Sequence, residues 1–468
     1  MSQRHLFDIP EDVAYFNAAY YTPQLNATRE RLLEAAAAKS HPWNRTTDSF
    51  FDDADTLRRL AAELFGGDAD GFAIMPAASY GLSAAARALE PRLGRGDRIL
   101  VVADEFPSNV LPWRRVAQET GAEIATTPAP AGGDWARAIV SMIDARVKVV
   151  AVSSCLWTNG ARIDLAPVSA AARANGSALV IDATRSLGTM PFSIPAIQPD
   201  FLVAATYKWL LCPYGMALMY VAPEWRGARP LEEGWLARDN ARDFTSLANY
   251  SDNYAAGARR FDGGETVTNN LPGAIAALTQ IRNWGVDHIA RSIAAMNTAI
   301  AGELARLGFY APPESQRCPH MFGATLPSPR SGSIVADLRA RKIYISQRGQ
   351  SLRFSPHLYN TAGDVTRLIN ALASLTGGSE RSSESLISGT TNPYCRANFR
   401  RILATRCASS PCEARSCVAS CLPRHSSISG IRSVSFIESR ASASARAAMS
   451  SALAFSCASC AAKRRGMR

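Results

Sequence analysis

Two ionisable residues of this chain each follow an apolar run that has the character of a buried β-strand. Asp182 ends the apolar run 178–182, and Lys208 comes 26 residues later, just after the apolar run 201–205. A lysine amine forms a Schiff base with an aldehyde, and a carboxylate pairs with a protonated pyridine nitrogen. Strands that close on Asp and then on Lys therefore suit the chemistry of pyridoxal 5'-phosphate (PLP).

A phosphate group needs backbone donors, and the start of a helix supplies them. The segment 76–81 follows an apolar run and opens a helical pattern at 82–89, with the small residues Ala78 and Ser79 at the junction. Unpaired N–H groups and the helix dipole favour an anion at such a place. Such a junction alone is weak evidence for a phosphate site. Its position in the sequence relative to Lys208 strengthens the prediction.

The elements that would position these residues are seven short apolar runs separated by helical patterns. Strands with helical crossovers indicate an α/β fold with a mainly parallel sheet and helices on both faces. Ligands of such sheets gather at the carboxyl ends of the strands, where Asp182 and Lys208 fall. The predicted strands are Phe72–Pro76, Arg98–Ala103, Ala122–Thr126, Val147–Ser154, Ala178–Asp182, Phe201–Ala205 and Met216–Val221.

The pattern changes near residue 271 to long helices followed by short strands, which indicates a smaller α+β C-terminal domain. Helices are predicted at 271–283, 286–307 and 362–375, and strands near 320–326, 343–348 and 352–355. The predicted organisation is an N-terminal segment at 1–25, a large cofactor-binding domain at 26–270, the small domain at 271–376 and a tail at 377–468.

Charge and cysteine are concentrated in that tail. It holds fourteen of the 51 lysines and arginines, four glutamates, no aspartate and seven of the ten cysteines. The other 376 residues carry 37 basic and 36 acidic groups, so they give no electrostatic reason to expect nucleic-acid or membrane binding. Three body cysteines are too few for a disulfide framework and are normal for a reducing compartment.

The low-complexity tail is predicted to be disordered, since it lacks periodicity and is rich in Ser, Arg, Ala and Cys. A second interpretation is translation out of frame, because GC-rich coding read in a shifted frame yields these same residues. Sequencing the gene separates the two. The start of the chain has no apolar segment typical of a secretion signal and no run long enough to span a bilayer, so we expect a cytoplasmic protein.

Residues 12–376 resemble the class V aminotransferase family of fold-type I PLP enzymes. The resemblance rests on Asp182 and on the Tyr-Lys-Trp-Leu segment at 207–210, at the family's spacing. That group includes small-molecule aminotransferases, cysteine desulfurases, selenocysteine lyases, kynureninases and isopenicillin N epimerase. It implies a homodimer with active sites at the interface.

The resemblance also implies roles around the cofactor. Lys208 would hold the cofactor and move the Cα proton, while Asp182 would keep the pyridine nitrogen protonated. Phe106 would stack on the ring. The sequence departs from the family near the cofactor phosphate, where Arg185 and Tyr207 stand in place of residues that are common in relatives. The charge of Arg185 and the hydroxyl of Tyr207 could compensate for the phosphate contacts that are lost. The cofactor-binding set implied is Ala78, Ser79, Phe106, Asp182, Arg185, Tyr207, Lys208 and Thr266.

On the substrate side, the segment 351–360 matches the family's late arginine motif. Arg353 would grip the α-carboxylate of an amino acid with its planar fork. An arginine inside an apolar strand is costly unless it is paired, which favours a functional interpretation. Asn17 resembles the family's N-terminal substrate-side segment.

Transamination makes the fewest demands, since it needs only a proton shuttle and a pocket for the second substrate. Elimination, as in selenocysteine lyases, and epimerisation stay open. Cysteine desulfuration is disfavoured, because the approach to Arg353 at 341–350 has no cysteine to take up sulfur. A non-catalytic binding protein and a nucleic-acid binder that uses the tail are alternatives of other classes. Retention of Lys208, Asp182 and Arg353 together argues against the first, and only tail charge supports the second.

Overall fold

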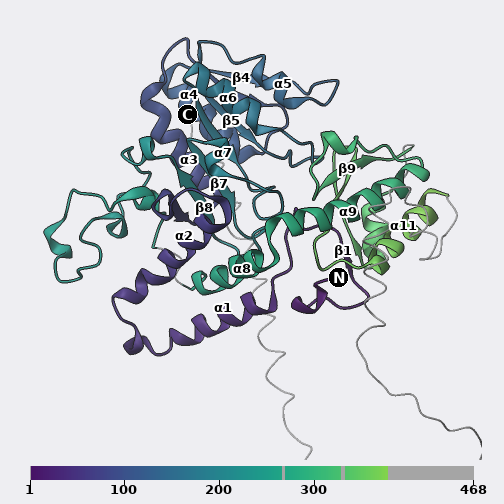
Figure 1. Cartoon of the computed structure of the whole chain (residues 1–468), viewed down its shortest axis with the longest axis horizontal. Coiled ribbons are helices and arrows are strands. Elements are labelled where there is room, and N and C mark those ends of the chain that lie inside the picture. Colours follow the sequence, from purple (N-terminus) through teal and green to yellow (C-terminus); the bar gives the residue numbers. More distant parts are fainter. Residues whose placement is uncertain (1, 266–268, 328–331, 378–468) are drawn as a thin grey trace, which may run out of the picture. The chain divides into compact units, whose positions relative to one another are not determined.

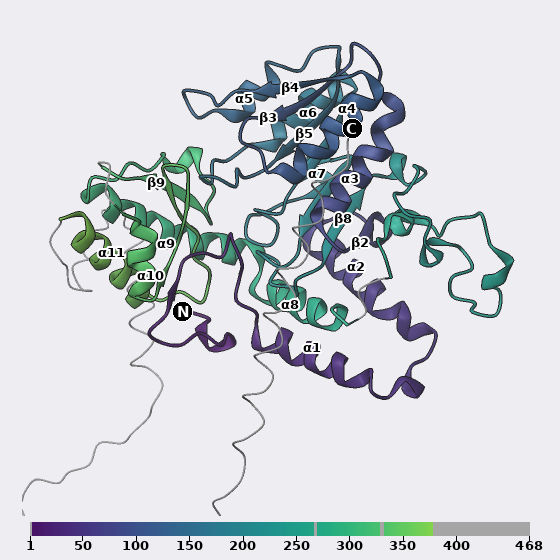
Figure 2. The same cartoon turned by 180° about the vertical axis from the view of Figure 1, so that it is seen from behind.

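The computed structural model describes residues 2–265, 269–327 and 332–377 (Figure 1, Figure 2). Thr266 and all but the first residue of the predicted tail lie outside the described residues. The helices are α1 Asn26–Ala38, α2 Asp52–Phe65, α3 Ala78–Leu89, α4 Leu111–Thr120, α5 Trp135–Val140, α6 Leu165–Asn175, α7 Ile194–Ile197, α8 Leu271–Trp284, α9 Val286–Arg306, α10 Ile334–Ala340 and α11 Ala362–Thr376.

A seven-stranded sheet forms the centre of the larger part and has the order β2-β8-β7-β6-β5-β3-β4. Five neighbouring strands, from β7 to β4, run parallel, while β8 is antiparallel to both β2 and β7. The predicted α/β fold is confirmed, and each strand lies within one residue of its predicted bounds. The strands are β2 Phe72–Met75, β3 Arg98–Val102, β4 Glu123–Thr127, β5 Val147–Ser153, β6 Ala178–Asp182, β7 Phe201–Ala205 and β8 Ala217–Val221.

Helices cover both faces of this sheet, because successive side chains of a buried strand point to opposite faces. In β6, Leu179 and Ile181 pack in the core shared with α5, α6 and α8, whereas Ala178 and Val180 pack in the core shared with α3 and α4. All five residues of this strand are buried. The near-continuous apolar runs of the sequence are thus explained by burial on two sides.

The second part contains the antiparallel sheet β11-β12-β9, with α10 and α11 packed in the same core. Its strands are β9 Phe322–Thr325, β10 Ile343–Tyr344, β11 Ser346–Arg348 and β12 Ser351–Phe354. The N-terminal strand β1, Ala14–Tyr15, pairs in parallel with β10. The first residues of the chain therefore complete a unit whose other elements come after residue 300.

Helices α8 and α9 connect the two parts (Figure 1). The buried face of α8 packs in the core of the large sheet, as does Ile293 near the start of α9, whereas Ile300 and Leu304 pack in the core of the second part. The predicted boundary at residue 271 remains a prediction. Packing favours a boundary inside α9, between Ile293 and Ile300.

Candidate active site

Lys208 follows β7 and is buried, with 5% of its surface exposed. Its Nζ lies 2.8 Å from the hydroxyl oxygen of Tyr207. Burial and then the positive charge of Arg185 lower the pKa of Lys208 to about 7, although the carboxylate of Asp182 acts in the opposite direction. A large fraction of this amine is therefore neutral near pH 7, which is the form that attacks a carbonyl carbon.

Asp182 lies at the carboxyl end of β6, next to the end of β7, and is buried. The backbone N–H of Thr184 donates to its Oδ1 at 2.9 Å. The Thr184 hydroxyl accepts from the N–H of Ala205, at 3.0 Å. These two hydrogen bonds connect the ends of β6 and β7, so the acid and the lysine are held on neighbouring strands.

Glu105 is a buried carboxyl group that the sequence analysis did not single out. It follows β3 and accepts hydrogen bonds from the backbone N–H groups of Phe106 and Ser153, at 2.8 and 2.9 Å. Burial, together with the negative charge of Asp182, raises the pKa of Glu105 to about 7. A signal was present in the sequence, since Glu105 stands at a strand end one residue before the stacking candidate.

Phe106 and Arg185 lie together on this side of the site. The guanidinium carbon of Arg185 is 5.3 Å from the centroid of the Phe106 ring, and the Trp157 ring meets that ring edge-on at 5.5 Å. Arg185 is buried and also donates to the carbonyl of Ala19. The backbone of Asp104 before them has a φ of 55°, an uncommon conformation for a residue with a side chain, and it turns the chain from β3 into this site.

Arg353 lies in β12 and is fully buried. Its Nη1 donates to the carbonyl of Trp157 at 2.5 Å and its Nε donates to the Ser346 hydroxyl at 3.1 Å. Within the described part of the chain, its Nη2 is buried and has no hydrogen-bond partner. Burial and the charge of Arg185 lower the pKa of Arg353 to about 9. One arm of this fork is therefore left for an acceptor from outside the chain.

The start of α3 lies at the end of β2. This helix has no side-chain hydrogen bond at its N-cap, and Ser79 in its first turn is exposed. Gly81 brings the helix close to the sheet, since a Cβ there would lie 2.5 Å from Met75 Sδ and 2.9 Å from Val203 Cγ1. Ala78 and Ser79 thus present an uncapped helix end, which favours an anion.

Asn17 joins the two parts of the chain near the same site. It pairs with Ser355 in a parallel bridge, and the Ser355 hydroxyl accepts from the N–H of Ala19 at 3.1 Å. The Oδ1 of Asn17 is buried and has no hydrogen-bond partner among the described residues. The structure therefore brings Asn17, Arg185 and Arg353 into one region, and Thr266 lies outside the described residues.

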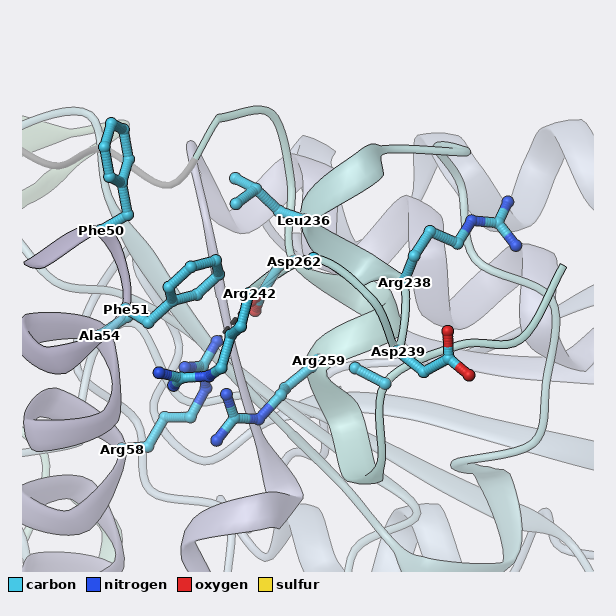
Figure 3. Close-up of a pocket in the computed structure, with 12 residues that line it drawn as sticks. Phe50, Phe51, Ala54, Arg58, Leu236, Arg238, Asp239, Arg242, Arg259 and Asp262 are labelled. Carbon is cyan, nitrogen blue, oxygen red and sulfur yellow. Dashed lines mark hydrogen bonds and ion pairs between the residues drawn. The ribbon is translucent and has the colours of Figure 1, made fainter. Parts of the chain in front are cut away.

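A pocket elsewhere on the protein does not contain these residues (Figure 3). Three of its arginines, Arg58, Arg242 and Arg259, point toward one another, and each has an ion pair with Asp55. Arg58 also pairs with Asp262, and Arg238 pairs with Glu233, so each arginine of this pocket already has a carboxylate partner. Its lining residues are Phe50, Phe51, Ala54, Arg58, Leu236, Arg238, Asp239, Ala241, Arg242, Ala255, Arg259 and Asp262.

Among the residues that the structure describes, none of the helices has both the length and the apolar character needed to cross a membrane. In the same residues, no group of three or more His, Cys, Asp and Glu side chains is arranged to hold a metal ion.

Known proteins match most of this chain. Residues 22–368 match the family model described as "Aminotransferase class-V". The uncharacterized aminotransferase YcbU of Bacillus subtilis is 26% identical over 68% of this chain and 83% of its own length. A probable cysteine desulfurase of Pyrococcus abyssi is 24% identical over 79% of this chain and 96% of its own.

Solved structures show the same fold at lower identity. The apo cysteine desulfurase of Thermococcus onnurineus NA1 has a TM-score of 0.71 and 20% identity, over 80% of this chain and 97% of its own. A C-DES mutant with glycine covalently linked to the PLP cofactor has a TM-score of 0.74 and 19% identity, over 81% of this chain and all of its own. At these identities the likeness shows the fold alone.

Proposed function

The chain belongs to the class V aminotransferase family, whose enzymes use PLP, and we propose that it acts at the Cα of an amino-acid substrate, with transamination as the net reaction. The observation that carries this proposal is the convergence of buried Lys208, Asp182 and Arg353, the last with a free N–H arm.

The residues present fit this cofactor. Lys208, Arg185 and Arg353 bring three basic groups into one region, against the carboxyl groups of Asp182 and Glu105. Such an excess of buried positive charge is costly without anions, and a cofactor phosphate and a substrate carboxylate would supply them. We propose that the start of α3 holds the phosphate, that Phe106 covers the ring and that Asp182 faces the ring nitrogen.

Each residue has a defined task in the proposed reaction. When bound, PLP supplies an electron sink for the charge that develops at Cα as its proton leaves. Arg353 binds the α-carboxylate through Nη2, which fixes the amino acid in place. The neutral Nζ of Lys208 then accepts the Cα proton and later donates it to a different atom of the bound substrate and cofactor. A pKa near 7 suits both proton transfers.

The cysteines of the described residues favour a reaction without a thiol acceptor. Cys155, Cys212 and Cys318 are each 3% exposed or less, and the segment leading to Arg353 contains none. A desulfurase that passes sulfur to its own cysteine needs an accessible thiolate. Elimination without such a thiol is the second candidate, because the relatives named above include cysteine desulfurases and a structural neighbour is a cystine C-S lyase. Epimerisation is a third outcome.

The test is a visible absorbance spectrum of the PLP-loaded protein, with Lys208→Ala beside it, before and after addition of a panel of L- and D-amino acids. We expect a visible band that the variant lacks and that some amino acids convert to the amine form of the cofactor. Release of ammonia and a keto acid with the band retained would replace transamination by elimination. A protein that cannot be loaded with PLP would overturn the proposal and favour a binding protein.

We propose in addition that the protein works as a homodimer, as the family implies. Sedimentation equilibrium of the loaded protein tests this. A monomer with full activity would contradict it.

A further inference from the structure

Four tyrosines gather beside Lys208 from two segments of the chain, one near residue 20 and the other between β7 and β8. The rings of Tyr207 and Tyr214 have centroids 4.4 Å apart, and Tyr21 lies 5.7 Å from Tyr207 and 5.8 Å from Tyr214. Tyr20 precedes Tyr21, and both are close enough to affect the pKa of Tyr207. Tyr20, Tyr21, Tyr207 and Tyr214 together are called the tyrosine wall below.

The tyrosine wall begins beside Lys208 and extends to Tyr15. Lys208 Nζ is 4.2 Å from the centroid of the Tyr207 ring. At the other end, Tyr15 donates a hydrogen bond to the carbonyl of Tyr21 at 2.6 Å, and its pKa responds to both Tyr20 and Arg353. A substrate whose carboxylate is at Arg353 and whose Cα is at Lys208 would therefore have the wall beside it.

Three of the four rings are substantially exposed: Tyr20 by 60%, Tyr21 by 50% and Tyr214 by 61%. Ring faces that pack on one another yet stay open to water have apolar area left to bury, and aromatic pairs gain more than area alone. Lys208 thus has an open aromatic surface beside it, and Arg353 has an N–H arm without a partner among the described residues.

Resting on the proposed function, we propose that the tyrosine wall is the side-chain subsite of this enzyme and that it selects amino acids with an aromatic side chain. Tyr21 and Tyr214 contribute ring faces to the subsite, and Tyr207 connects it to Lys208.

The test uses carboxylates that have no α-amine and so bind without reacting. Titration calorimetry of the PLP-loaded protein is carried out with 3-phenylpropanoate, propanoate, butanedioate and 6-aminohexanoate. We expect 3-phenylpropanoate to bind roughly tenfold or more tightly than propanoate, because a phenyl ring is buried. In Tyr21→Ala and Tyr214→Ala, that ratio should fall at least about threefold each, with propanoate affinity retained.

The matched control is Tyr250→Ala, since Tyr250 is 85% exposed and is not one of the tyrosine wall residues. It should leave every affinity unchanged. Equal binding of 3-phenylpropanoate and propanoate, preference for butanedioate, or an equal loss in Tyr250→Ala would each overturn the subsite. A protein that loads PLP but shows no aromatic preference refutes this inference alone, whereas failure to load PLP refutes the proposed function.

Discussion

At Lys208, burial and neighbouring positive charge act in the same direction, and Asp182 offsets only part of their effect. The same two causes lower the pKa of Arg353 to about 9. The isolated residues would be ordinary surface bases. Their buried positions inside one site lower both pKa values, and only that of Lys208 comes near neutral pH.

The first prediction concerns the pH dependence of apoprotein stability. Lys208 has a pKa of about 7 in the folded chain and an ordinary value of 10.5 when unfolded, so the unfolded state binds more protons between these values. Below pH 7 the folded chain buries Lys208 in its charged form, which lowers the free energy of unfolding by at most about 5 kcal/mol. This cost disappears as the pH rises toward 10.5. In urea unfolding of the apoprotein, Lys208→Met should be more stable than the unchanged protein at pH 7. The difference in their free energies of unfolding should narrow by pH 9.5. A constant gap would contradict the shifted pKa.

The second prediction concerns Arg353. Replacing the planar fork with an ammonium in Arg353→Lys keeps a charge but loses the geometry for a carboxylate. We expect kcat/KM to fall by about 10- to 100-fold, equivalent to a charged hydrogen bond of about 1.5–3 kcal/mol, mainly through KM. The visible band should be retained, which steady-state kinetics and a spectrum together check. Loss of the band would mean that Arg353 acts on the cofactor instead.

At the scale of elements, the carboxyl ends of neighbouring strands do most of the positioning. β6 carries Asp182, β7 leads to Lys208, and Ser153 at the end of β5 holds Glu105, which follows β3. The register of parallel strands places these ends side by side. Helix α3 adds its uncapped start at the end of β2.

The third prediction tests the close approach of α3 to the sheet. In Gly81→Ala the new Cβ would overlap Met75 Sδ and Val203, so these side chains or α3 must shift. We expect a loss of about 1–3 kcal/mol in unfolding free energy and weaker PLP binding, measured by urea unfolding and by cofactor titration.

Gly302→Ala is the matched control, since Gly302 lies in α9 with open space around it. Removing a helical glycine there should raise stability by about 0.5–1 kcal/mol without changing PLP affinity. If both variants lose PLP affinity equally, the close packing of α3 is not what positions the phosphate site.

At the scale of the whole molecule, the N-terminal segment connects the two parts through the site. β1 pairs with β10, Asn17 pairs with Ser355, and Ala19 accepts from Arg185. The residues before 377 carry little of the net charge, because most of the net +11 belongs to residues after 376.

The fourth prediction concerns a chain truncated after Gly377, the αL residue that ends α11. Its net charge falls from +11 to about +1, so retention on a cation exchanger at pH 7 should be lost. The visible band and the thermal midpoint should stay unchanged, within roughly 2 °C. A large drop in the midpoint would show that residues beyond 377 contribute to the folded core.

The strands, the α/β class and the positions of Asp182 and Lys208 at strand ends could be predicted from the sequence, because each depends on local pattern. Apolar runs of four to seven residues form strands whatever lies far along the chain, and a charged residue at such an end falls at the sheet's edge. The roles assigned to the site residues are still predictions, although the structure places Lys208, Asp182 and Arg353 together.

Tertiary structure alone decided what depends on contacts between distant segments. Glu105 lies beside Asp182 only because β3, β5 and β6 are neighbours, Tyr21 reaches Tyr214 across nearly two hundred residues, and α8 packs with the large sheet. Local pattern fixes which face of an element is apolar, but many partners could cover that face. The choice is made by the packing of the whole chain, where burial also sets the pKa values that chemistry uses.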